Sequence, residues 1–493
     1  MDKSVDEPPS TSAKTAGAIT VAGQLIKGIV QFVGLVAFSH LLSPRDIGLI
    51  AMLAVFLMLG ETIRDFGLLQ AAIQTPKLTH GQASNLFWSN TFIGLVMSVS
   101  LTAAAPAVAA MYSEPTLRAV APWIALSFSI NALQTQFQVR LARDLRFMAL
   151  TATDALSQVI GLAAGLVAAV AGAAYWSLVI QMLTIYVALL IMRVVVSGWW
   201  PGLPRRESGM KALYLFGIHS GLTQLLNFFA YNTDSYLIGT RWGASALGIY
   251  NRAFQMFTVP ANQLLAPLTN VALPLLSRRR HAGGDFYPLL LKAQVAISVA
   301  LTAMFSLAAA LAHPIVEVVL GPTWSKSAPL LSILSIGGAV QVMSYIVFWA
   351  FLASGNARQL FYAGLVTRSI LVLCIVVGSL AGLAGVAWGF TTGLAISWFI
   401  NLAWLRRCDS MPVRIFLRSG VHVLLSGLVA GLAGWGLVAV AGPNINVFIL
   451  LVLGFIVVSA VYAILILANR LAREMLRENV GPAVARLRGL GKT

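Results

Sequence analysis

The chain has 493 residues, of which 58% are hydrophobic and only 10% are charged. Soluble globular domains carry about 25% charged residues, so this composition excludes a soluble protein. The formal net charge of +17 would suggest nucleic-acid binding in a soluble chain. In a membrane protein we expect such a charge to report topology, with no nucleic-acid partner.

Residues 1–14 are polar, contain acidic residues and proline, and lack the basic segment and adjoining apolar run of a cleaved signal peptide. We therefore expect the first apolar segment to remain in the mature protein. Crossing about 30 Å of hydrocarbon takes about 20 helical residues, and runs of that length recur from Thr15 almost to Asn469. The predicted membrane-spanning helices are 15–41, 47–73, 86–111, 119–139, 148–171, 175–196, 212–239, 247–275, 288–311, 328–353, 360–380, 383–405, 416–441 and 446–468.

Fourteen such spans predict an all-α polytopic membrane protein with both termini on one side. The predicted parts are a cytoplasmic N-terminal tail (1–14), an N-lobe of six spans (15–196), a cytoplasmic inter-lobe loop (197–211), a C-lobe of six spans (212–405), two further spans (406–468) and a basic cytoplasmic tail (469–493). The C-terminal tail has the pattern of a basic amphipathic helix that lies on the lipid headgroups of the inner membrane face.

Lysine and arginine are distributed unequally between the two sides of the membrane. Of the 33 such residues, 26 fall on the side of the termini and 5 on the opposite side. Cytoplasmic loops carry the excess of positive charge, so we expect both termini in the cytoplasm of a bacterium with the chain in its inner membrane. The clusters at 140–146, 278–280 and 406–418 can be interpreted as lipid-headgroup or substrate sites, but we favour solvated charge that sets the topology.

Two pairs of matching turns indicate an internal repeat. The turn LSPRDIGL at 42–49 matches WGASALGI at 242–249, since each leads into a helix through an aliphatic-Gly-aliphatic step. The segments at 115–122 and 322–329 both read Pro-Thr, four residues, then Ala-Pro. Because the matches occur in the same order and on the same membrane side, the first six spans and the next six are predicted to be parallel repeats, followed by two extra spans.

Two six-helix lobes of this kind are typical of transporters, in which the substrate site lies between the lobes near the midplane. A membrane scaffold or an intramembrane enzyme would leave the repeat unexplained. The sequence contains no Walker A loop, zinc-binding histidine pair or nucleophile elbow, so we expect neither an enzyme nor a metal site. Cys374 lies in an apolar run and Cys408 in a basic loop, which implies no disulfide framework.

Charged residues are rare inside the predicted spans, and those present should face a cavity or a partner. Lys27 lies midway along the first span, and Glu61, Arg64 and Asp65 share one helical face of the second. An antiparallel hairpin turning at 43–44 would bring Lys27 to the level of Glu61 and Arg64. The four charges can form a purely structural neutral network. Alternatively, Lys27 and Arg64 bind a phosphate while Glu61 and Asp65 bind or release a coupling ion.

The 200-residue offset places Asn227 in the second lobe where Lys27 stands in the first, and Leu264 where Arg64 stands. The charge cluster is therefore confined to the first lobe. Asp234 lies near the outer end of its span and is expected to line the outer mouth with Arg241 and Arg252. The remaining polar side chains of this region are His219, Gln224, Asn232, Asn262 and Gln263.

Four segments together resemble the Wzx-type flippases, the polysaccharide transport branch of the multidrug/oligosaccharidyl-lipid/polysaccharide (MOP) exporter superfamily. They are HLLSPRDIGLIAM (40–52), IRDFGLLQAAIQ (63–74), the block 234–277 and LGPTWSKSAPLLSILSI (320–336). The resemblance covers nearly the whole chain, and the block 234–277 is its most specific part. It implies a MOP/MATE-like fold.

The resemblance also implies a rocker-switch flippase that carries undecaprenyl-pyrophosphate-linked oligosaccharide repeat units from the cytoplasmic to the periplasmic leaflet. Energy would come from a proton or sodium gradient, with no bound cofactor. Cavities in this family are typically cationic, a role that falls here to Lys27, Arg64 and Arg252, with Asn227 in the second lobe; Glu61, Asp65 and Asp234 are the candidates for ion coupling. The expected partners are membrane lipids, a polysaccharide polymerase and a chain-length regulator, and the expected state is a monomer.

Three other functions remain open from the sequence. A lipid II flippase of the same superfamily would be essential for growth, and a cation-coupled multidrug exporter would move a soluble dye. A non-transporting scaffold for polysaccharide assembly would do neither.

Overall fold

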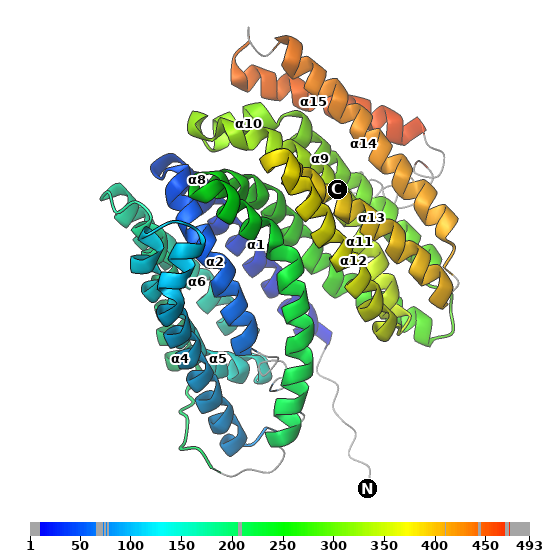
Figure 1. Cartoon of the computed structure of the whole chain (residues 1–493). Helices are drawn as coiled ribbons and strands as arrows, with labels where there is room; N and C mark the ends of the chain where they lie inside the picture. The colour runs from blue at the N-terminus through cyan, green and yellow to red at the C-terminus, as the bar shows by residue number, and fades with distance from the viewer. Residues whose placement is uncertain are drawn as a thin grey trace, which may run out of the picture. The chain divides into compact units, whose positions relative to one another are not determined.

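The structure is a computed structural model that describes residues 10–65, 72, 75, 78–205, 210–409, 411–441, 445–468 and 473, without the side chains of residues 10–22, 65, 211–227, 229, 266, 267, 270 and 271. Throughout this part of the chain the regular elements are helices (Figure 1), which confirms the all-α prediction. A backbone in hydrocarbon has no water to bond to, and a helix satisfies its N–H and C=O groups within one segment.

The elements are bounded as follows: α1 (Ser10–Leu41), α2 (Pro44–Asp65), α4 (His80–Met111), α5 (Thr116–Arg143), α6 (Phe147–Val170), α7 (Trp176–Ser197), α8 (Met210–His281), α9 (Tyr287–Ala310), α10 (Ala312–Val319), η1 (Pro322–Ser327), α11 (Ala328–Ala353), α12 (Ala357–Gly378), η2 (Ser379–Ala381), α13 (Gly382–Asp409), α14 (Val413–Ala441) and α15 (Val447–Ala468).

Eleven described segments are long and apolar enough to cross a membrane, and one of them, 357–409, contains both α12 and α13. The bent helix α8 is not among the eleven, but its two limbs correspond to the predicted spans 212–239 and 247–275. The described helices therefore match the fourteen predicted spans one to one, and α10 and the two 3-10 turns are additional.

The bend of α8 is centred on Gly243, which has φ 77° and ψ −175°. This left-handed conformation costs glycine little because it lacks a Cβ atom. The bend lets the two limbs approach each other, and the Tyr250 hydroxyl donates a hydrogen bond to Asp234 Oδ2 over 2.8 Å. Asp234 and Tyr250 are both buried, so this bond joins the limbs on either side of Gly243.

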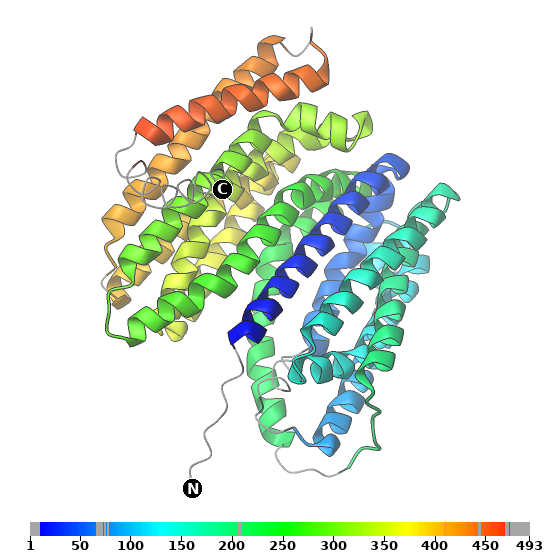
Figure 2. The ribbon, with the colours of Figure 1, turned by 180° about the vertical axis from the view of Figure 1, so that it is seen from behind.

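The chain divides into two compact units, one up to Asn251 and one from Arg252. In the first unit α4 packs on α5, α6 on α7 and α5 on α7, while α1 packs on α6. Figure 2 shows α1, in dark blue, running beside α6. The first two of these pairs are neighbours in sequence, as expected for short turns between antiparallel helices.

In the second unit α9 packs on α11, α12 on α13 and α11 on α13. These contacts repeat those of α4, α5, α6 and α7 at the equivalent positions, so the packing carries the repeat predicted from the turns. The last two helices, α14 and α15, pack on each other and on α9 (Figure 1, orange). They therefore lie outside the repeat. The predicted limits of the lobes, 15–196 and 212–405, stay a prediction.

The two turns that revealed the repeat contact each other within the first unit. A Cβ atom on Gly48, in the first turns of α2, would lie 1.7 Å from the carbonyl oxygen of Ala244. A Cβ atom on Gly248 would lie 1.9 Å from the carbonyl oxygen of Pro44. Both distances are far below van der Waals contact, so these helix ends meet backbone to backbone, as small residues allow in membrane proteins.

Replacing either glycine with alanine should therefore destabilise the protein. We expect Gly48→Ala and Gly248→Ala each to cost about 1–3 kcal/mol, because the methyl group forces the two backbones apart. The measurement is the midpoint of thermal unfolding of the purified protein in detergent, followed by tryptophan fluorescence. Gly436→Ala is the matched control, since a Cβ atom at Gly436 has no heavy atom within 4 Å. Equal midpoints for all three variants would contradict the close contact.

Candidate functional site

A chain of hydrogen-bonded polar side chains runs through the first unit and joins four helices. We call it the polar chain, and its members in order are Glu61 on α2, Asn131 and Gln134 on α5, Arg193 on α7 and Asp154 on α6. Polar groups in a membrane interior are costly unless they bond to one another, so a continuous chain of this kind is a candidate functional site.

Glu61 forms one end of the polar chain. Asn131 Nδ2 donates to Glu61 Oε1 over 3.0 Å, and the Tyr186 hydroxyl on α7 donates to the same oxygen over 2.8 Å. Both bonds end on Oε1, so this one carboxylate oxygen joins α2 to α5 and α7.

Arg193 is the buried cation of the polar chain, with only 3% of its surface exposed. Its guanidinium donates to the Gln134 amide oxygen, to Gln138 Oε1 over 3.0 Å and to Asp154 Oδ1 over 2.5 Å. A buried charge is tolerated only with a counterion and further hydrogen bonds, and Arg193 has both. The Asp154 side chain is 46% exposed, so the polar chain is open at this end.

The local sequence explains why α5 lies at the centre of this arrangement. Gln134 Nε2 donates to Asn131 Oδ1 over 2.6 Å, and Asn131, Gln134 and Gln138 follow one another at spacings of three and four residues. Such spacings put all three on one face of the helix. This polar face makes the side-chain hydrogen bonds of α5 to α2 and α7.

Sequence reasoning missed most of the polar chain. It identified Glu61, but it counted Arg193 only among the 26 cations on the side of the termini, whereas the structure buries Arg193 within α7. The missed signal was the polar face of the fourth predicted span, together with a carboxylate in the fifth (Asp154) and a cation in the sixth (Arg193). Which of these groups would bond to which is set by packing and could not be read from the sequence.

The predicted charge cluster is described in part. Lys27 is half-buried on α1, and Arg64 is 4% exposed at the end of α2, one turn after Glu61. The side chains of Asp65 and Asn227 lie outside the described residues. Glu61 bonds to neutral side chains of α5 and α7, and its pairing with Lys27 stays a prediction.

Asp234 and Arg252 are both buried, at 2% and 4% exposure. Asp234 accepts the Tyr250 bond and a bond from its neighbour Ser235 N over 2.7 Å. Arg252 donates from Nη1 to Gln255 Oε1 over 2.9 Å and lies 5.8 Å from the ring centroid of Trp324. The predicted lining of an outer mouth by these residues stays a prediction, and the packing around Arg252 would have to open for it to reach a substrate.

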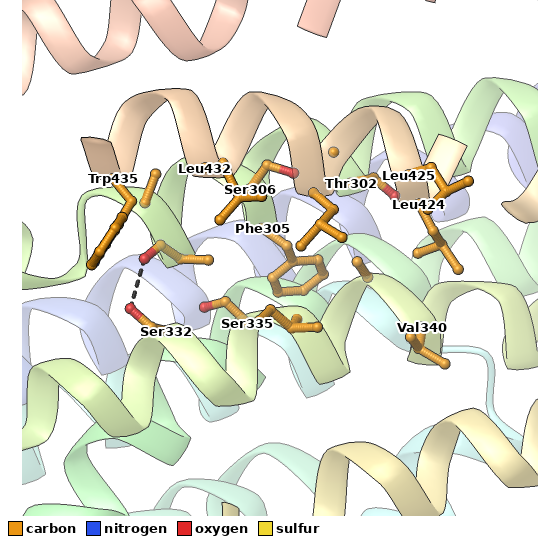
Figure 3. Close-up of a pocket in the computed structure, with 17 residues that line it drawn as sticks. Thr302, Phe305, Ser306, Ser332, Ser335, Val340, Leu424, Leu425, Leu432 and Trp435 are labelled. Carbon is orange, nitrogen blue, oxygen red and sulfur yellow. Dashed lines mark hydrogen bonds between the residues drawn. The ribbon is translucent and has the colours of Figure 1, made fainter. Parts of the chain in front are cut away.

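An apolar groove lies within the second unit, between α9, α11 and α14 (Figure 3). Its volume is about 430 Å³, in the range of small-molecule sites. Trp435 stands at one end and Val340 at the other, and the outer wall includes the exposed side chains Leu425 and Leu432. In a bilayer such an opening would face hydrocarbon, so the groove suits a lipid chain.

In the described part of the chain, no group of three or more His, Cys, Asp or Glu side chains is placed to hold a metal ion. The polar chain instead offers charge, hydrogen bonds and a carboxylate at each end. With Glu61 ionised it holds two carboxylates and one guanidinium, and protonation of Glu61 would make it neutral overall.

The sequence profile of a family described as "Polysaccharide biosynthesis protein" matches residues 37–329. The chain is 24% identical over 347 residues to the teichuronic acid biosynthesis protein TuaB of Bacillus subtilis (strain 168), covering 68% of this chain and 70% of TuaB. It is 22% identical to the lipopolysaccharide biosynthesis protein WzxC of Escherichia coli (strain K12), covering 74% of each. It is also 22% identical over 465 residues to the succinoglycan biosynthesis transport protein ExoT of Rhizobium meliloti (strain 1021), covering 93% of this chain and 92% of ExoT.

Two solved structures share the fold. The lipid II flippase MurJ in an inward closed conformation matches with a TM-score of 0.74 at 13% identity, covering 93% of this chain and 100% of MurJ. An inward-facing multidrug resistance MATE family transporter of the MOP superfamily matches with a TM-score of 0.55 at 14% identity, covering 82% of this chain and 99% of that one. These matches confirm the predicted MOP/MATE-like fold.

The pair of the buried Arg193 with the half-exposed Asp154 should contribute more to stability than a pair with both side chains exposed. We expect Asp154→Asn to lower the free energy of unfolding by about 1–3 kcal/mol, below the 3–5 kcal/mol of fully buried pairs because Asp154 is half exposed. Asp144→Asn is the matched control, since Asp144 pairs with Arg140 over 2.9 Å with both side chains exposed, and should cost under about 1 kcal/mol. Detergent unfolding midpoints measure both, and an equal loss in the two variants would contradict a structural role for the buried pair.

Proposed function

Because the chain belongs to the polysaccharide biosynthesis protein family, the Wzx-type branch of the MOP superfamily, we propose that it flips lipid-linked oligosaccharide repeat units across the bacterial inner membrane. The match over residues 37–329 carries this proposal. Membership makes the chain a multi-pass membrane transport protein for polysaccharide biosynthesis and not an enzyme. The finer statement, which we propose, is that undecaprenyl-pyrophosphate-linked repeat units move from the cytoplasmic to the periplasmic leaflet.

The relatives support a polysaccharide precursor as the cargo. TuaB, WzxC and ExoT are named for the biosynthesis of three different polysaccharides. ExoT, named a transport protein, aligns over 93% of this chain. The precursors of such different polysaccharides would share the lipid pyrophosphate and differ in their sugars. We therefore propose that recognition rests on the pyrophosphate and the isoprenoid chain more than on the sugars.

The pyrophosphate would be bound by cations inside the membrane. Lys27 on α1 is half-buried and Arg64 on α2 is buried, and an arginine offers a planar pair of donors that matches a phosphate. An anionic ligand stabilises a buried cation, because it takes the place of the water that the cation lost on burial. Asn227 and Arg252 complete the proposed set of substrate-binding residues, and the apolar groove between α9, α11 and α14 is proposed to hold part of the isoprenoid chain.

Transport would be coupled to a proton or sodium gradient at Glu61. Its carboxylate is half-buried and accepts two hydrogen bonds on one oxygen. Binding of a cation would weaken the bonds from Asn131 and Tyr186, because a neutralised carboxylate is a poorer acceptor. That change would loosen α2 from α5 and α7, and so link ion binding to a rocking motion. Asp65 and Asp234 are the other proposed ion-coupling residues.

Deletion of the gene should leave lipid-linked repeat units in the inner leaflet and abolish the surface polysaccharide. We expect the wild-type gene to restore the polysaccharide, whereas Lys27→Ala and Arg64→Ala restore less than about a tenth of it, because each removes a phosphate-binding cation. Radiolabelled lipid-linked sugars and extracted surface polysaccharide are the two measurements, with membrane levels of each variant determined by immunoblot.

Lys326→Ala is the control for loss of a cation, because Lys326 is exposed in η1, and it should restore the polysaccharide fully. Full restoration by both cavity variants at normal membrane levels would refute the roles of Lys27 and Arg64. Normal surface polysaccharide in the deletion strain would refute the function itself. Loss of viability would point to a lipid II flippase, and loss of dye efflux alone to a drug exporter.

Glu61→Gln should uncouple transport from the ion gradient. Glutamine keeps an oxygen that can accept the bonds of Asn131 and Tyr186, but it cannot take up a proton. In proteoliposomes, an imposed proton or sodium gradient should accelerate flipping by the wild type several-fold and leave the variant unchanged. Glu317→Gln, at an exposed position on α10, should behave like the wild type. An undiminished response in Glu61→Gln would exclude Glu61 as the coupling group.

A further inference from the structure

A second pocket, which the proposed function does not use, lies where α13 ends and α14 begins. We call it the basic pocket. Its volume is about 520 Å³, enough for a lipid headgroup with the first part of a chain. Its lining comprises two arginines and five apolar side chains: Phe399, Leu402, Ala403, Arg406, Arg407, Val413 and Leu417.

The surrounding helices are fixed in place by hydrogen bonds to α9. Gln294 Nε2, fully buried, donates to the Phe416 carbonyl oxygen and to Ser419 Oγ, each over 2.9 Å. The Tyr287 hydroxyl donates to Asp409 Oδ2 over 2.9 Å, and its ring packs edge-on against Phe416. The start of α14 and the end of α13 are therefore both tied to α9, so the basic pocket is preformed.

The charge around the basic pocket is unbalanced. The stretch 399–418 contains one acidic residue, Asp409, and four arginines. Those arginines are Arg406, Arg407, Arg414 and Arg418. Asp409 already pairs with Arg280 over 2.7 Å, with only 11% of its side chain exposed. The two arginines of the lining are exposed, so the basic pocket is positively charged and lacks an internal anion to neutralise it.

Helix length places the basic pocket at the membrane surface. α13 has 28 residues, and at 1.5 Å per residue it is about 42 Å long, whereas the hydrocarbon core is about 30 Å thick. The last turns of α13, with Arg406 and Arg407, thus extend into the headgroup region. One turn or more earlier, Phe399 and Leu402 face the same pocket from within the hydrocarbon.

We propose that the basic pocket binds an anionic phospholipid of the surrounding leaflet. Arg406 and Arg407 would hold the headgroup phosphate, as basic pockets between transmembrane helices do. Phe399, Leu402 and Leu417 would contact the first part of an acyl chain. The amphipathic lining distinguishes this lipid from a soluble phosphate, which would gain nothing from the apolar wall. Binding of this lipid does not depend on whether the cargo of the protein is a repeat unit.

The test is a titration of the full-length protein in detergent with phosphatidylglycerol, followed by native mass spectrometry. We expect phosphatidylglycerol to bind at least about tenfold more tightly than phosphatidylcholine, since each of the two arginines contributes roughly a fivefold gain near an anionic lipid. The double variant Arg406→Gln/Arg407→Gln should lose most of that preference. Ala403→Trp, which keeps both arginines but fills the pocket from an exposed position on α13, should lose binding as well.

The control is Arg414→Gln/Arg418→Gln, which removes the same charge from exposed residues of α14 outside the lining and should retain most of the preference. Equal losses in the two double variants would overturn the proposal in favour of diffuse surface charge. Unchanged binding in Ala403→Trp would exclude the pocket itself. Tighter binding of undecaprenyl phosphate than of phosphatidylglycerol would assign the basic pocket to the substrate and overturn the proposal too.

Discussion

A cation buried in a membrane protein must find an anion and further acceptors, and Arg193 imposes this requirement on the first unit. Its bonds draw Gln134 and Gln138 of α5 and Asp154 of α6 to α7. Without a counterion, the charge would cost several kcal/mol in so dry a position. The three helices are thereby held in one arrangement, and the rest of the polar chain depends on it.

The consequence extends to Glu61 through Asn131 and Gln134. The amide nitrogen of Asn131 donates a hydrogen bond to Glu61, and its amide oxygen accepts one from Gln134. The two bonds fix the orientation of the Asn131 amide. The fixed amide in turn presents a donor to the Glu61 carboxylate. Under the coupling proposed at Glu61, a change of its charge would alter the contact of α2 with α5 and not only one side chain, as coupling to a conformational change requires.

Most of the fold could be predicted from the sequence, because the length and apolar composition of a segment are enough to identify a helix that crosses the hydrocarbon. The repeat could also be predicted, since Gly48 and Gly248 occur in matching turns, where the close backbone contact disfavours any larger residue. The polar chain could be predicted only in part. Gln134 and Arg193 have no local motif, and their roles depend on how α5 and α7 pack, which periodicity does not specify.

Lipid contacts divide between two places in the second unit with different chemistry. The groove between α9, α11 and α14 is apolar, whereas the basic pocket between α13 and α14 combines arginines with an apolar wall. α14 contributes to both. Although α14 lies outside the repeat, it therefore supplies features that the six-helix repeat does not contain.

The contact of Gly48 with Ala244 and of Gly248 with Pro44 is reciprocal, since Ala244 stands 200 residues after Pro44 just as Gly248 stands 200 after Gly48. Reciprocity of this kind is the property of an interface across a two-fold axis, where each copy offers the same surface. A half-length protein with one such turn could have formed the contact with a second copy of itself. The glycine pair thus has, inside one chain, the geometry of a symmetric contact between two copies of the same turn.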